Sequence, residues 1–82
     1  MDKIEIELKI NNAADEFFES VKDEVEKENL ALRYAMNSID SIEFLLVLEE
    51  KFDIEFDEDH FNISFLQDKS KIVDYIYEVM ES

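Results

Sequence analysis

The chain has 82 residues, with 8 Lys and Arg against 23 Asp and Glu, and it contains no Gly, Pro, Cys or Trp. Without Gly it can have neither a phosphate-binding P-loop nor a dinucleotide-binding fingerprint, because both need a backbone free of Cβ atoms beside the ligand. Without Cys, and with a single His, it has no disulfide, no thiolate nucleophile, no Cys-ligated zinc and no His-rich metal site.

The net charge of −15 would repel the phosphates of nucleic acids and of anionic lipids. We therefore expect no nucleic-acid partner, and a protein partner with a basic surface instead. The longest apolar run, residues 44–48, is too short for a membrane span. No segment resembles a signal peptide, and the lack of Cys is compatible with a reducing compartment, so we predict a cytoplasmic monomer with one domain over residues 1–82.

The first predicted element is an extended segment near the N-terminus. Its apolar residues alternate with charged ones, which is the two-residue period of a strand. These residues are Ile4, Ile6, Leu8 and Ile10. The only comparable segment that could pair with it is the short alternation over residues 54–56. The sequence thus predicts an extra N-terminal extended segment beside a helical fold.

An amphipathic helix is predicted next, over residues 13–27. Its apolar positions recur at steps of three and four residues, and Asn12 followed by Asp15 is typical of a helix start. These positions are Ala13, Ala14, Phe17, Phe18, Val21 and Val25. Residues 29–37 then form a connection with apolar side chains that can pack on the bundle.

The most strongly patterned helix is predicted from Ser38 to Lys51. Its apolar face holds Ile39, Ile42, Leu45, Leu46, Leu48 and Phe52, and its wet face holds Asp40, Glu43, Glu49 and Glu50. A helical turn over residues 57–61, started by Asp57, precedes a final helix over residues 68–80 with Asp68 as its cap. The final helix is predicted to bury Ile72, Val73, Tyr75, Ile76 and Val79. The elements together predict an all-α fold, a small bundle of three or four helices.

Residues for catalysis or metal binding are scarce. His60 lies in the most acidic stretch, where a lone His is more often solvated, so we predict that the protein is not an enzyme. Acids at positions 53, 55, 57 and 59 have the alternate spacing of a calcium loop. However, the turn glycine is missing and Ser64 stands where the closing Glu is needed. We interpret the stretch as a solvated acidic loop and expect no metal site.

Residues 37–56 resemble the second helix of acyl carrier proteins. In that family an Asp-Ser-Leu motif opens a helix that ends in a Leu-Glu-Glu-x-Phe run, and here the corresponding residues are Asn37-Ser38-Ile39 and Leu48-Glu49-Glu50-Lys51-Phe52. The resemblance implies a bundle of acyl-carrier type. It also implies a motif serine that bears 4′-phosphopantetheine, attached from coenzyme A, whose thiol carries acyl or aminoacyl groups as thioesters. Such a carrier shuttles intermediates between enzymes of fatty acid, polyketide or related biosynthesis.

Two serines compete for the attachment role. Asp40-Ser41-Ile42 looks more like the motif, but this alignment needs three residues deleted before Phe52, whereas aligning Ser38 needs no gap. Ser38 at the mouth of a helix would be exposed, and its phosphodiester would meet free N–H groups and the positive end of the helix dipole. Ser41, further in, could bond a preceding carbonyl. We predict attachment on Ser38, with Ser41 as the alternative and a simple helix-capping role as the non-functional interpretation of Ser38.

Two residues beside Ser38 depart from the family pattern. Asn37 stands where the family has Asp; Asn can still cap a helix, but it lacks the charge. Ala35 stands where the family has Gly, and its Cβ restricts the loop. The resemblance is strong over residues 30–56, moderate to residue 76 and weak before residue 30.

Nine acids and one Lys lie between Asp40 and Asp59. A charge run of this kind is usually a solvated surface. The resemblance implies that it docks on basic surfaces of a phosphopantetheinyl transferase and of acyl-loading and acyl-processing enzymes. The acids expected to steer docking are Asp40, Glu43, Glu49 and Glu50, with apolar contact from Ile39, Ile42 and Leu46. Two other functions stay open: an unmodified carrier-like acidic adaptor for a basic protein partner, and an acidic mimic of nucleic acid.

Overall fold

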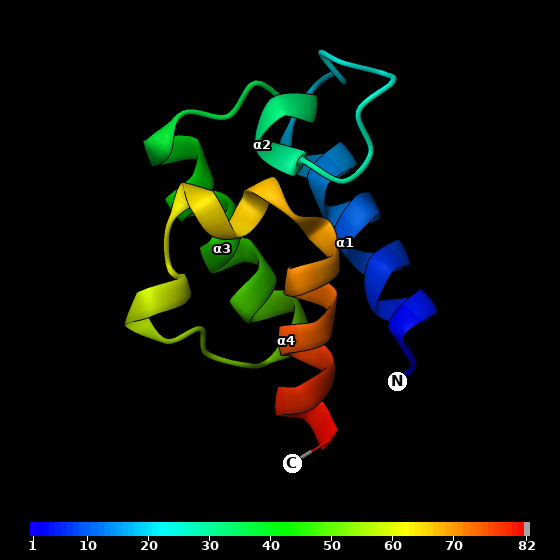
Figure 1. Ribbon diagram of the computed structural model, residues 1–82, viewed down its shortest axis with the longest axis vertical. Coiled ribbons are helices and arrows are strands. Elements are labelled where there is room, and N and C mark those ends of the chain that lie inside the picture. Colours follow the sequence, from blue (N-terminus) through cyan, green and yellow to red (C-terminus); the bar gives the residue numbers. More distant parts are fainter. Residues whose placement is uncertain (82) are drawn as a thin grey trace.

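Three long helices form the frame of the protein: α1 (Lys3–Phe17), α3 (Ser38–Phe52) and α4 (Lys69–Glu81) (Figure 1). The computed structural model describes residues 1–81, and in this range it contains no strand. Three short segments complete the fold: the α-helical turn α2 (Leu30–Arg33) and the 3-10 helices η1 (Glu58–His60) and η2 (Ile63–Gln67). The predicted all-α helical bundle is confirmed. None of the described helices is both long and apolar enough to cross a membrane.

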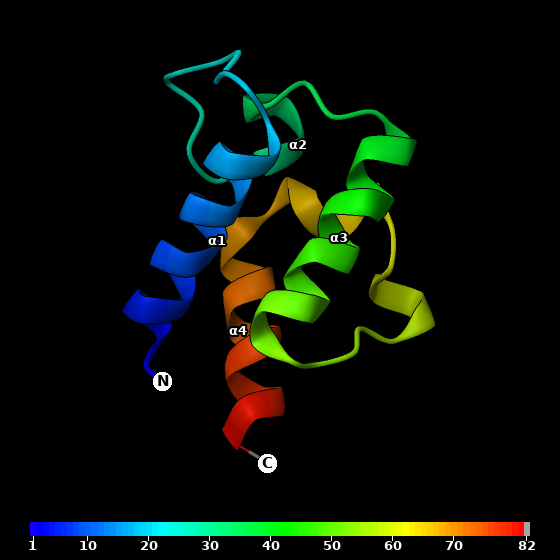
Figure 2. The same ribbon diagram turned by 180° about the vertical axis from the view of Figure 1, so that it is seen from behind.

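One hydrophobic core joins these elements. Both α3 and α4 pack against α1, and η2 packs against α2, α3 and α4. Figure 1 views the molecule from the side of η2 and α4, and Figure 2 from the side of α3. The largest fully buried side chains come from all of these elements: Ile6, Ile10, Leu30, Phe44, Leu45, Leu48, Leu66, Ile72 and Ile76. These elements pack on the inner face of α3 and do not cover its outer face.

The N-terminal segment is helical, so the predicted extended segment is wrong. The carboxylate of Asp2 accepts the N–H of Glu5 at 2.8 Å and begins α1. Ile6 and Ile10 are fully buried, whereas Ile4 is 72% and Leu8 56% exposed. The alternating isoleucines and leucine therefore divide between two faces of one helix. A two-residue alternation includes the four-residue step of a helix, so this short pattern fits both structures.

The predicted helix over residues 13–27 is also wrong, because α1 ends at Phe17. In residues 18–29 local side chains replace the helical acceptors: Asp23 Oδ1 accepts the N–H of Val25 and of Glu26, and Glu26 Oε1 accepts the N–H of Glu28 and of Asn29. Val25, expected on the apolar face, is 90% exposed.

The two later helices match their predictions within a residue at each end. α3 begins at Ser38, and α4 follows Asp68, whose carboxylate accepts the N–H of Ser70 at 3.1 Å. Asp57 begins η1, as predicted. The predicted burial holds for Ile72, Val73 and Ile76, whereas Tyr75 is only half-buried and Val79 is exposed. Ile39 and Leu46 on α3 are also exposed, because the core covers only the side of α3 that holds Phe44, Leu45, Leu48 and Phe52.

A buried ammonium ties α4 to α1. The Lys69 side chain is almost fully buried, and its Nζ lies 3.0 Å from a carboxylate oxygen of Glu7 and 3.8 Å from one of Glu28. Asn11 Oδ1 accepts from the same ammonium at 3.4 Å. The backbone N–H of Lys69 donates to the Glu28 carbonyl at 2.7 Å. The partners compensate for the lost hydration of the charge, so Lys69 fixes the start of α4 against both α1 and the segment before α2.

The two faces of α1 give the first prediction. Ile6→Val is expected to lower the free energy of unfolding by about 0.5–1.5 kcal/mol, because it removes a buried methylene. Ile4→Val removes the same group from an exposed site and is expected to change stability by less than about 0.5 kcal/mol. Urea unfolding followed by circular dichroism measures both values. Equal losses for the two variants would contradict the assigned faces of the helix.

Candidate functional site

The start of α3 presents Ser38 to solvent. Asn37 Oδ1 accepts the N–H of Asp40 at 2.7 Å, and Asp40 Oδ2 accepts the N–H of Asn37 at 3.3 Å. This reciprocal capping box shows that Asn37 caps the helix, as predicted for the residue that replaces the family's Asp. Ser38 is the first helical residue and is exposed, and its hydroxyl has no hydrogen-bond partner among the described residues. Asn37, not Ser38, is therefore the cap, and the Ser38 hydroxyl is free.

Ser41 lies one turn further along and is fully buried. Its hydroxyl donates to the carbonyl of Asn37 at 2.8 Å and lies 3.9 Å from the sulfur of Met36. The predicted bond to a preceding carbonyl is thus present. A reagent can reach the Ser38 hydroxyl on the folded protein, whereas reaching that of Ser41 requires the first turn of α3 to open.

The loop before Ser38 contains a strained residue. Ala35 has a φ of 50°, in the left-handed region that favours Gly. Its N–H donates to the Leu32 carbonyl at 3.2 Å, and the N–H of Met36 donates to the Ala31 carbonyl at 2.8 Å. This pair of bonds is a Schellman motif, which normally ends with Gly. Ala35 therefore stands at a position that normally holds Gly, and its Cβ restricts the backbone of the loop, as predicted.

One face of α3 carries acids and aliphatic side chains in a single exposed row. We call it the α3 stripe, and it consists of Ile39, Glu43, Leu46 and Glu50, all exposed. These residues are spaced by four, three and four positions, so they follow one side of the helix from its start beside Ser38. Figure 2 views the molecule from the side on which this helix lies. The stripe combines charge and apolar surface next to the exposed hydroxyl.

The remaining residues predicted to dock have other contacts. Asp40 belongs to the capping box, and the carboxylate of Glu49 accepts the N–H of Phe56 at 2.7 Å. Ile42 is half-buried. Glu43 and Glu50 make no hydrogen bond or ion pair within residues 1–81, so they are the two predicted acids whose charge is fully available on the surface.

The acidic loop after α3 provides no metal centre in the part of the chain that the structure describes. No group of three or more His, Asp or Glu side chains there could hold a metal ion. His60 Nδ1 lies 2.6 Å from Asp57 Oδ1, and this hydrogen bond lowers the pKa of the Asp57 carboxyl. Asp57 also accepts the N–H of His60, so its carboxylate serves to organise η1.

A scan against known protein-family models found no match, and no curated protein matched the sequence. The residues around Ser38 and along α3 are therefore the basis on which a function can be argued.

Ala35 gives the second prediction. Ala35→Gly is expected to raise the free energy of unfolding by about 0.5–1 kcal/mol, because relief of the left-handed strain exceeds the entropy that Gly adds to the unfolded chain. Ala31→Gly, within α2, is the control and is expected to lower stability by about 1 kcal/mol. Urea midpoints at constant slope measure both changes. A loss of stability in Ala35→Gly would contradict this prediction, because it would show that the strain is smaller than the entropy that Gly adds to the unfolded chain.

Proposed function

We propose that the protein is an acyl or aminoacyl carrier that bears 4′-phosphopantetheine on Ser38. It shuttles thioester-linked intermediates between enzymes of fatty acid, polyketide or related biosynthesis, in the cytoplasm and as a monomer, and has no catalytic activity of its own. The observation that carries the proposal is the free, exposed hydroxyl of Ser38 at the start of α3, in a segment that resembles the family's modified helix. The buried Ser41 supports Ser38 as the attachment residue.

The first turn of α3 suits a phosphodiester on Ser38. The first N–H groups of a helix have no acceptor within it, and Asn37 satisfies only that of Asp40. The N–H groups of Ser38 and Ile39 therefore remain at the positive end of the helix dipole, close to the Ser38 hydroxyl.

Attachment requires only the hydroxyl from this chain. Ser38 Oγ would attack the phosphorus that carries the pantetheine group in coenzyme A, forming the phosphodiester as the pyrophosphate bond breaks. Adenosine 3′,5′-bisphosphate leaves, and the hydroxyl proton passes to the transferase or to solvent. The arm supplies a thiol, which the chain lacks because it has no Cys.

The α3 stripe suits transient docking of the enzymes that would use such a carrier. Glu43 and Glu50 would meet basic side chains of a phosphopantetheinyl transferase or an acyl-loading or acyl-processing enzyme, while Ile39 and Leu46 would contact apolar surface between them. Charged contacts at an exposed rim speed encounter more than they tighten the complex. Fast and weak binding is what a shuttle needs, because it must leave each enzyme before it reaches the next.

The attachment site gives the third prediction. The protein is incubated with coenzyme A and a broad-specificity phosphopantetheinyl transferase, and its intact mass is measured. We expect the wild type to gain the mass of one phosphopantetheine, Ser41→Ala to gain the same mass, and Ser38→Ala to gain none. Circular dichroism of both variants checks that each is folded, which makes them matched controls for one another.

Two results would contradict this assignment. A gain lost only in Ser41→Ala would mean that the first turn of α3 opens and that the other serine is the attachment site. No gain in the wild type would favour the unmodified acidic adaptor, for which the neutral Asn37 in place of Asp is the supporting feature.

The α3 stripe gives the fourth prediction. Glu43→Lys is expected to lower kcat/KM of the transferase reaction several-fold at low salt and much less at high salt, because the lost attraction is screened. Glu24→Lys, on the exposed segment before α2, changes the net charge equally and is the control. Equal effects of both variants would show that only the overall charge matters, and no effect of either would remove the docking role of the stripe.

A further inference from the structure

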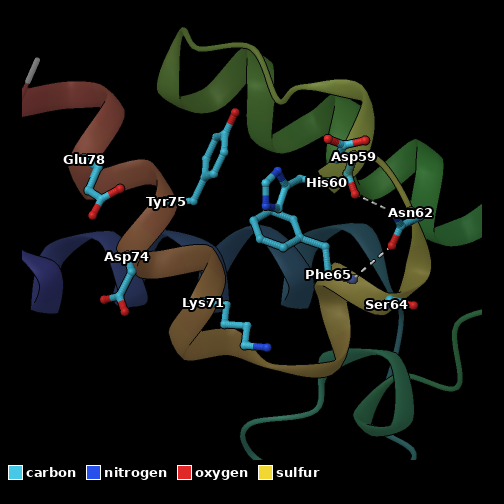
Figure 3. A pocket seen from close by; sticks show the side chains of 9 residues that line it. All are labelled: Asp59, His60, Asn62, Ser64, Phe65, Lys71, Asp74, Tyr75 and Glu78. Atoms are coloured by element: carbon cyan, nitrogen blue, oxygen red, sulfur yellow. Dashed lines mark hydrogen bonds between the residues drawn. The ribbon is translucent and has the colours of Figure 1, made fainter.

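A groove lies between η1, η2 and α4, and it shares no residue with the α3 stripe or Ser38 (Figure 3). Its volume is about 510 Å³, within the usual range of ligand pockets. Its aromatic lining comes from His60, Phe65 and Tyr75, and its carboxylates from Asp59, Asp74 and Glu78. Neither the all-helical fold nor the attachment of an arm on Ser38 requires this combination.

Three rings meet in the groove. The ring centroids of His60 and Phe65 are 5.0 Å apart, those of His60 and Tyr75 are 5.0 Å apart, and those of Phe65 and Tyr75 are 5.6 Å apart. Figure 3 shows the rings of His60 and Phe65 next to each other, with Tyr75 beside them. Phe65 is buried, whereas His60 and Tyr75 are half-buried. Phe65 thus forms the floor of the groove and the other two rings form its accessible wall.

Hydrogen bonds hold two of these rings in place before any ligand binds. Asp57 accepts from the His60 ring at 2.6 Å, and its own N–H donates to the Tyr75 hydroxyl at 3.1 Å. The Tyr75 hydroxyl in turn lies 3.4 Å from the Glu55 carbonyl, to which it donates. A wall that is already ordered loses little entropy when it binds a ligand.

The charges around the rings favour a cationic ligand. Asp74 is 3.0 Å from Lys3 and is thus partly neutralised; Lys3 also attracts the Glu78 carboxylate at longer range, but neither Glu78 nor Asp59 makes an ion pair within residues 1–81. Lys71 also lines the groove, yet its ammonium pairs with none of these three carboxylates. Ring faces attract cations, and the free carboxylates add to that attraction. The groove therefore has unused capacity for a positive group.

We propose that this groove is a second contact surface, which receives an arginine side chain of a basic protein partner. A guanidinium is planar, so it can stack on the His60 or Tyr75 ring while its N–H groups reach Asp59 or Glu78; an ammonium is a more strongly hydrated point charge and cannot stack. The net charge of −15 draws such a partner toward the protein. The proposal does not depend on modification of Ser38.

The fifth prediction tests the chemistry of the ligand. The full chain is titrated with acetyl-Gly-Arg-Gly-amide, and with the same peptide carrying lysine or citrulline in place of arginine, while NMR signals of the His60 and Tyr75 rings are followed. We expect saturable shifts with the arginine peptide, several-fold weaker binding of the lysine peptide and no saturable shift with the neutral citrulline peptide. Equal binding of the citrulline peptide would overturn the proposal, because charge would then be irrelevant.

Paired variants test the location. Asp59→Asn combined with Glu78→Gln keeps the shape of two exposed side chains and is expected to weaken binding of the arginine peptide about three- to ten-fold. Glu19→Gln combined with Glu24→Gln removes the same charge from the exposed segment before α2 and is expected to weaken it less than about two-fold. Equal losses in both double variants, or shifts centred on α3, would overturn the proposal in favour of non-specific attraction to an acidic protein.

Discussion

The position of each helix in this protein depends on Asp and Asn side chains that satisfy free backbone N–H groups. Every helical segment within residues 1–81 begins directly after such a residue: Asp2, Asn29, Asn37, Asp57, Asn62 and Asp68. The chain has no Pro or Gly to punctuate it, so these side chains determine where helices start. The candidate site follows from one of them: because Asn37 is the cap, Ser38 lies on the exposed first turn and Ser41 points into the core.

Because the chain lacks Gly, other residues must adopt the left-handed conformation at the ends of its helices. Within residues 1–81, two residues adopt the left-handed conformation, Asp53 after α3 and Ala35 after α2. Asp enters this region more readily than most residues, because its short polar side chain can bond locally, whereas Ala has no such compensation. The conformation at Ala35 directs Met36 into the core beside Ser41 and sends the chain into α3. The left-handed conformation of Ala35 therefore helps to set the direction in which the chain enters α3, and with it the position of Ser38.

The sequence predicted a helix correctly where its apolar period and its capping residue agreed. For α3 and α4, an apolar period of helical spacing begins directly after a capping residue, and both signals agree. At the N-terminus the alternation of Ile4 to Ile10 fits a strand and a helix equally well, and the Asp2 cap together with packing against α4 and α3 favours the helix. Val21 and Val25 continue a helical period, but the side chains of Asp23 and Glu26 capture the N–H groups that a helix would use.

For the candidate site too, the sequence predicted what depends on one helix start and missed what depends on several elements meeting in space. The exposure of Ser38 and the burial of Ser41 could be inferred from their places relative to one helix start. The groove could not, because His60, Phe65 and Tyr75 come from η1, η2 and α4 and share no period along the chain. In the sequence His60 lies among acids, and that placement on its own equally describes a solvated loop residue.

On the proposed assignments, the two surfaces would share one long-range attraction but differ in short-range chemistry. Both lie in the field of a chain of net charge −15, so the field brings a basic partner close without choosing between them. The choice would come at contact: the α3 stripe offers aliphatic Ile39 and Leu46, whereas the groove offers ring faces on which a guanidinium can stack. The groove is lined by residues of η1, η2, α4 and the segments beside them, whereas the stripe lies on α3, so the two surfaces share no residue. Contact with one surface therefore uses no side chain of the other.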